Sequence, residues 1–95
     1  MIKESRGLLT LEAAEMLAVD AFAWLAGEPE ALARFLSLSG IDAATLRSAT
    51  ADPGFLVGIL DFITGDEALL MAYSGQAGIR PERVVAAQRT LNRHD

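Results

Sequence analysis

One tract of the sequence returns 38 residues later, and this repeat constrains the fold more than any other feature. The two copies of the tract share the same register at three kinds of position: the two glycine turns, the acid that follows the first turn, and the apolar residues between the turns. The corresponding positions are Gly27 and Gly65, Glu28 and Asp66, Leu32 and Leu70, Phe35 and Tyr73, Gly40 and Gly78, and Ile41 and Ile79. The repeat predicts two related three-helix units, over residues 17–49 and 55–87.

A second explanation of the match stays open, because only 6 of the 33 aligned positions are identical. An alanine- and leucine-rich chain whose helices have similar lengths can give such a match without duplication. The shared register of the glycine stops and of the helix-start acid favours two related units.

The apolar residues have a helical period, and no stretch alternates as a half-buried strand does. Threonine, aspartate and proline favour helix starts and glycine favours helix ends, so these residues divide the chain. The predicted helices run from Thr10 to Ala26, Pro29 to Gly40, Asp42 to Ala49, Asp52 to Thr64, Asp66 to Ala77, and onward from Pro81. We therefore predict an all-α fold, a compact bundle of about six short helices in one domain over residues 1–95. Its ordered core spans about 8–91, with frayed residues at both ends.

The fourth predicted helix is the expected centre of the bundle. Residues 55–63 are apolar apart from Gly58 and Asp61, and a helix that is apolar on all sides is normally enclosed. Gly58 has no side chain, so we expect another helix to approach closely there. Gly58 corresponds to Asp20 in the first unit, and the two units therefore differ at this position.

The composition argues against several classes of function. The chain has no cysteine, which excludes disulfides and thiolate metal sites. Its 13 acidic residues outnumber the 8 lysines and arginines, which disfavours a general affinity for nucleic acid or anionic membrane. Acidic residues interrupt the apolar N-terminal stretch, unlike a signal peptide, and the apolar run at 55–60 is too short to span a membrane. We expect a cytoplasmic protein with no membrane partner.

The charge is distributed unevenly along the chain. Residues 80–95 hold 4 arginines against 2 acids, whereas the rest of the chain holds 11 acids and 4 bases. An acidic body and a basic final helix could pair between two copies, which predicts a homodimer; the alternative is that both surfaces are simply solvated.

Three carboxylates are the candidates for chemistry. Asp61 lies in the most apolar helix, where it is either a functional acid or a structural residue. As a structural residue it would lie on the one solvent-exposed stripe of the helix, or meet an arginine or the N-terminus of a neighbouring helix. Asp66 and Glu67 could join it in a metal or acid–base cluster, but helix capping already explains both. His94 is the sole histidine and lies next to the C-terminus, where we expect disorder. We predict no catalytic residue, no metal and no cofactor.

The aromatic residues are expected mainly in the core, since they recur at helical spacing. Tyr73 is the exception, because its hydroxyl could reach the surface. We predict a partner-binding face made of Tyr73, Arg80, Arg83 and Arg89.

The same region offers a DNA-binding alternative. Ser74, Gly78 and Val84 have the spacing of a helix-turn-helix, and the arginines would lie on its recognition helix. The same Gly-Ile turn occurs at Gly40 without arginines, and the overall charge is acidic, so nucleic acid is the less favoured partner.

Much of the chain resembles a family of small bacterial proteins, catalogued as domain of unknown function 3572. The motifs that carry the resemblance span about residues 8–90 and are Phe35-Leu36, Gly40-Ile41, Asp52-Pro53-Gly54-Phe55-Leu56, Leu60-Asp61-Phe62 and Asp66-Glu67-Ala68-Leu69-Leu70. The resemblance implies a compact helical protein of this length, without known catalytic or binding residues. Genes of the family can lie near response-regulator genes, which favours a signalling protein as the partner.

The residues and the resemblance together predict a non-enzymatic protein–protein interaction or regulatory module. A DNA-binding regulator that uses its C-terminal helix pair is the first alternative. A carboxylate-based or metal-dependent enzyme is the second, and it requires Asp61, Asp66 and Glu67 to converge in one pocket.

Overall fold

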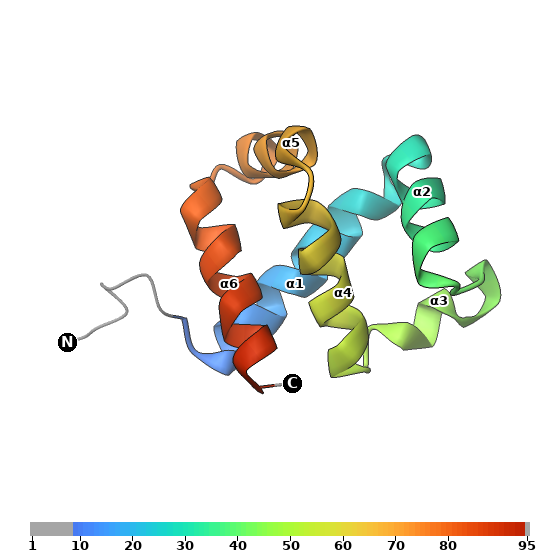
Figure 1. Cartoon of the computed structure of the whole chain (residues 1–95), viewed down its shortest axis with the longest axis horizontal. Helices are drawn as coiled ribbons and strands as arrows, with labels where there is room; N and C mark the ends of the chain where they lie inside the picture. The colour runs from blue at the N-terminus through green and yellow to red at the C-terminus, as the bar shows by residue number, and fades with distance from the viewer. Residues whose placement is uncertain (1–8, 95) are drawn as a thin grey trace.

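The computed structural model describes residues 9–94, apart from the side chains of Ala43, Arg47 and His94. Over these residues the chain forms six helices and no strand. They are α1 (Leu11–Ala26), α2 (Pro29–Ser39), α3 (Ala43–Ala49), α4 (Pro53–Thr64), α5 (Glu67–Ala77) and α6 (Pro81–His94). The predicted all-α fold and the predicted helix boundaries are confirmed. Figure 1 shows α1 passing behind α4, with α5 and α6 on one side of this pair and α2 and α3 on the other.

Side chains of the expected type begin the helices. The Thr10 hydroxyl accepts a hydrogen bond from the backbone N–H of Ala13, and the Asp42 carboxylate accepts one from the N–H of Thr45. Asp52 and Asp66 cap α4 and α5 in the same way. These carboxylates satisfy N–H groups that have no partner inside the helix, and their negative charge is favoured at a helix N-terminus.

The two units keep their offset in the folded chain. Helices α2 and α5 begin 38 residues apart and end 38 residues apart. Gly40 and Gly78 end these two helices with φ angles of 75° and 71°, in the left-handed region that glycine adopts without strain. Helix α3 corresponds only to the first half of α6, which continues to His94. The third helix is therefore where the units differ most in length.

The units also exchange aromatic contacts. The ring of Phe35 in α2 lies 5.4 Å from that of Phe62 in α4, and the ring of Tyr73 in α5 lies 5.5 Å from that of Trp24 in α1. The 38-residue offset relates Phe35 to Tyr73 and Trp24 to Phe62. The second helix of each unit thus places an aromatic ring on the first helix of the other unit.

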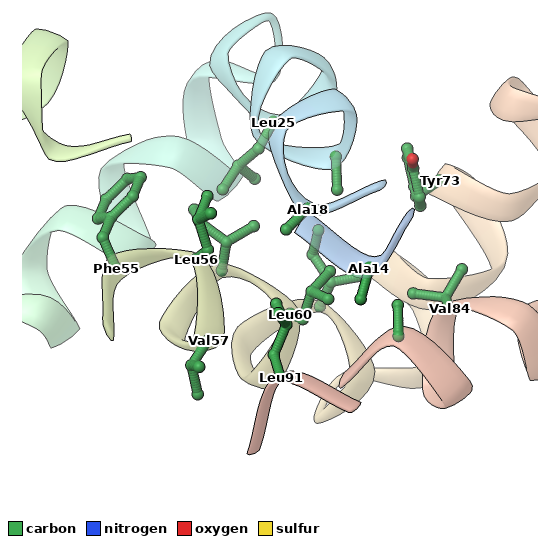
Figure 2. Close-up of a cluster of buried hydrophobic side chains, with 14 of the residues drawn as sticks. Ala14, Ala18, Leu25, Phe55, Leu56, Val57, Leu60, Tyr73, Val84 and Leu91 are labelled. Atoms are coloured by element: carbon green, nitrogen blue, oxygen red, sulfur yellow. The ribbon is translucent and has the colours of Figure 1, made fainter. Parts of the chain in front are cut away.

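The core is built mainly from α1, α4 and α6. Helix α1 contributes small residues, and α4 contributes the largest apolar set (Figure 2). Phe55 and Tyr73 lie at opposite ends of the cluster in that view. The principal buried residues are Ala14, Ala18, Ala21, Leu25, Phe55, Leu56, Ile59, Leu60, Ile63, Tyr73, Val84, Ala87 and Leu91. Helix α4 packs against α1, α5 and α6, as its apolar sequence predicts.

The predicted close approach at Gly58 is wrong. A Cβ atom added to this glycine would meet nothing within 4 Å. The fully buried small residues are instead the alanines of α1, Ala14, Ala18 and Ala21. Their short side chains let neighbouring backbones approach, and Gly58 has no such role.

Further predictions concern the membrane and the chain ends. Within residues 9–94, no helix is both long enough and apolar enough to cross a bilayer. The predicted fraying of the first residues lies outside the described residues, and so does the predicted disorder of the His94 side chain.

Candidate functional site

Asp61 lies on an exposed stripe between α4 and α6. Its Oδ1 atom accepts hydrogen bonds from Nε2 of Gln88 at 2.8 Å and from Nδ2 of Asn92 at 3.1 Å. Asn92 also donates to the backbone carbonyl of Gln88, one turn earlier in α6. The carboxylate is therefore exposed and hydrogen-bonded, and it joins the second half of α6 to α4.

Asp66 has a different set of partners. One oxygen caps α5 through the N–H groups of Ala68 and Leu69, and the other accepts a hydrogen bond from Nη2 of Arg34 at 3.2 Å. The guanidinium of Arg34 also lies 5.4 Å from the centre of the Phe62 ring. Asp66 thus joins α5 to α2.

The structure does not bring the predicted carboxylates together. Asp61 is bound to α6, whereas Asp66 is bound to α2, and Glu67 is exposed at the start of α5. Within residues 9–94, no group of three histidine, cysteine, aspartate or glutamate side chains is arranged to hold a metal ion.

Tyr73 is buried, and the prediction that its hydroxyl reaches the surface is wrong. The residue is 1% exposed, and its hydroxyl donates a hydrogen bond of 2.7 Å to Oδ2 of Asp20 in α1. Burial raises the pKa of Tyr73 far above its usual value, and the hydrogen bond and negative charge of Asp20 raise it further. A buried tyrosine hydroxyl needs a partner, and Asp20 supplies it from the other unit.

The predicted partner face is therefore divided. Arg80, Arg83 and Arg89 are exposed at or along α6, but Tyr73 is beneath the surface. Arg83 and Arg89 are six residues apart, so they project about 120° from one another around the helix. The three arginines do not form one compact patch with the tyrosine.

The C-terminal helix pair has the turn that the sequence predicts. Gly78 is left-handed, Ser74 and Val84 are buried, and α5 packs against α6. These contacts are common to many helix pairs, so DNA binding by the arginines stays a prediction.

A hollow of about 650 Å³, which the sequence did not predict, lies beside α1, and we call it the α1 groove. Met16 and Val19 are 68% and 43% exposed there, although both side chains are large and apolar. Leu56 of α4 is buried and closes the groove on the other side. The lining comprises Glu12, Glu15, Met16, Val19, Asp20 and Ala23 of α1, Thr50 and Ala51 of the connection between α3 and α4, and Pro53 and Leu56 of α4.

The α1 groove follows one face of its helix. Glu12, Met16, Val19 and Ala23 recur at intervals of three and four residues, which is the spacing of a helical face. The opposite face of α1 carries the buried alanines and Leu25. The apolar residues of α1 therefore surround much of the helix, and their period alone could not show which of them stay uncovered.

The corresponding face of α4 is covered only in part, since Asp61 is exposed there. Val57, the counterpart of Val19, is 8% exposed. Asp61, the counterpart of Ala23, is bonded to the second half of α6. In the first unit, residues 50–56 form the connection and the start of α4, where the second unit has the rest of α6. The α1 groove thus lies where the first unit has a connection and the start of α4 in place of a longer third helix.

Comparisons with known proteins identify one match. The family model described as "Protein of unknown function (DUF3572)" matches residues 11–94, a span that includes all six helices. No curated protein and no solved structure shows a significant match.

Proposed function

Because the chain belongs to the DUF3572 family of proteins of unknown function, as its motifs predict, we propose a function from its surface. In this proposal the chain is a cytoplasmic, non-enzymatic protein–protein interaction module, and its α1 groove binds a helix of another protein. The observation that carries this proposal is the exposed apolar stripe of Met16, Val19 and Ala23 beside the buried Leu56.

The dimensions of the groove support a helical ligand. A volume of about 650 Å³ lies within the usual range of binding clefts. From Glu12 to Ala23 the lining extends over three turns of α1, or about 16 Å at the usual helical rise. An amphipathic helix bound in a groove uses apolar contacts at such intervals.

The walls of the groove favour binding because they are already ordered. Ala18 and Ala21 fix the reverse side of α1 in the core, and Leu56 belongs to the central helix α4. A preformed wall loses little conformational freedom when a partner docks, so more of the apolar contact contributes to affinity. Exposed apolar side chains gain about 25 cal/mol per Å² when they leave water.

Photo-crosslinking tests this function. A photoreactive amino acid at position 16 should capture a host protein, and the additional change Val19→Lys should abolish capture because it puts a charge in the groove. The matched control is the same photoreactive residue at Leu38 of α2, which is 72% exposed but outside the groove. Circular dichroism of each variant checks the fold. Equal capture from positions 16 and 38, or capture that survives Val19→Lys, would contradict the proposal.

A further inference from the structure

We propose that the occupant of the α1 groove is a cationic amphipathic helix, whose aliphatic side chains cover Met16 and Val19 and whose lysines or arginines meet the acidic rim. This inference rests on the docking function proposed above and names the class of partner. The rim consists of three carboxylates, those of Glu12, Glu15 and Asp20.

The rim is acidic without internal compensation among the described side chains. The lining of the groove contains no lysine, arginine or histidine. The ion pair found within residues 9–94 joins Arg34 of α2 to Asp66 at the start of α5, away from the groove lining. A neutral or acidic helix that closed the groove would desolvate three carboxylates without giving them a partner. A cationic helix would replace water by opposite charge, which also speeds association.

Asp20 is the best positioned of the three carboxylates. The Tyr73 hydroxyl holds its Oδ2 atom at 2.7 Å, so the side chain has a fixed orientation. Because the phenol keeps its proton well above neutral pH, this hydrogen bond orients the carboxylate without cancelling its charge. Oδ1 of Asp20 can then accept a hydrogen bond from a lysine or arginine of the partner.

The spacing of the acids defines the pattern of the partner. Glu12 and Asp20 are eight residues apart, or about 12 Å along α1. Met16 lies halfway between them on the same stretch of the helix. A partner helix that carries basic residues about two turns apart can pair them with Glu12 and Asp20, while a leucine or alanine between them contacts Met16.

The charges disfavour a symmetric pair of α1 grooves. In an isologous dimer the same patch faces itself, so the three carboxylates of one copy would meet those of the other. Like charges in such a contact oppose binding. The basic helix α6 of a second copy is the remaining self-partner, and the experiment below distinguishes it.

Two matched peptides test the inference. Both are designed helices of about 15 residues, the length that an isolated helix needs for stability, with leucine and alanine on one face. One peptide carries lysines on its other face, and the second carries glutamines at those positions. Each is titrated into the isotope-labelled full chain and followed by NMR, which reports both the affinity and the backbone amides that shift.

We expect the lysine peptide to shift the amides of α1 around Met16 and to bind about tenfold more tightly than the glutamine peptide at low salt. High salt should remove most of this difference, because the rim is exposed and its charges are screened. Glu12→Gln with Glu15→Gln should also reduce it, because two of the three rim carboxylates lose their charge, while leaving the binding of the glutamine peptide unchanged. Val19→Lys should abolish the binding of both peptides.

The outcomes separate the two proposals. If neither peptide shifts the amides of α1, the docking function itself is wrong. If both bind equally in the groove, docking stands and the cationic partner is wrong. If light scattering of the chain alone shows a dimer that Glu12→Gln and Glu15→Gln dissociate, the occupant is a second copy, and the proposal of a separate partner is overturned.

Discussion

The two halves of this chain have second helices with matching boundaries, but they have different surfaces. The units α1–α3 and α4–α6 share the glycines that follow their first and second helices, and each places an aromatic ring of its second helix on the first helix of the other. They differ in the third helix, because the Asp52-Pro53 start of α4 follows α3 closely whereas α6 continues to His94. Similar local signals produced similar helices. The short third helix of the first unit, α3, leaves the groove face of α1 exposed.

The same difference affects packing throughout the two units. Val84 of α6 is fully buried, but its counterpart Leu46 of α3 is only half-buried. Figure 1 shows α6 lying along α1 and α4, and α3 at the end of the molecule away from it. The third helix of the second unit thus contributes to the core together with α1 and α4, whereas the third helix of the first unit contributes little.

The largest expected loss of stability tests the aromatic contacts that the two units share. Phe35→Ala and Tyr73→Ala should each lower the free energy of unfolding by about 3–5 kcal/mol, because each ring is buried against the other unit. Urea unfolding followed by circular dichroism measures the loss. Leu38→Ala, at an exposed position of α2, should change stability by less than about 0.5 kcal/mol. A large loss at only one of the two aromatic positions would show that the units do not dock on each other in the same way.

The next prediction tests how the third helices of the two units, α3 and α6, differ in packing. Val84→Ala should cost about 2 kcal/mol, since it removes fully buried methyl groups and leaves a cavity. Leu46→Ala should cost only about 1 kcal/mol, although it removes more atoms, because the side chain is already partly in water. Thermal or urea unfolding of the two variants gives the comparison. A greater loss for Leu46→Ala would mean that α3 is as firmly packed as α6.

The polar contact between the units gives a smaller effect. Tyr73→Phe should cost about 1 kcal/mol, the usual value of a lost hydrogen bond. Asp20→Ala should cost more, about 1–3 kcal/mol, because it leaves a buried hydroxyl donor without its acceptor. Urea unfolding measures both variants. Equal losses would indicate that water replaces Asp20 at the hydroxyl.

Tyr73 also makes stability depend on alkaline pH. The folded state raises the pKa of this phenol, so the unfolded chain loses the proton first, near pH 10. The unfolded state then binds fewer protons than the folded state, and stability falls as the pH rises above about 10. Tyr73 is the sole tyrosine, so Tyr73→Phe should remove this part of the decline. Urea midpoints between pH 8 and pH 11 provide the measurement, and an identical decline in both proteins would contradict the assignment.

The sequence predicted the helices well because their boundaries depend on local chemistry. Thr10, Asp42, Asp52 and Asp66 cap the helices that follow them, as their side chains predict. The environment of Tyr73 could not be predicted in this way, because its partner Asp20 is 53 residues away in the chain. The α1 groove could not be predicted for a similar reason, since the exposure of Met16 depends on where α3 ends and on how the connection to α4 lies beside α1.

The smallest predicted effect returns to Gly58, where the sequence interpretation failed. A Cβ at this position meets no atom, and glycine inside a helix is less favourable than alanine by about 0.5–1 kcal/mol. Gly58→Ala should therefore raise the free energy of unfolding by about that amount, in contrast to the loss expected for Asp20→Ala at the corresponding position of α1. Gly75→Ala in α5 is the matched control, because its Cβ also meets nothing. A gain for Gly75→Ala together with a loss for Gly58→Ala would show that the chain needs close backbone contact at α4 after all.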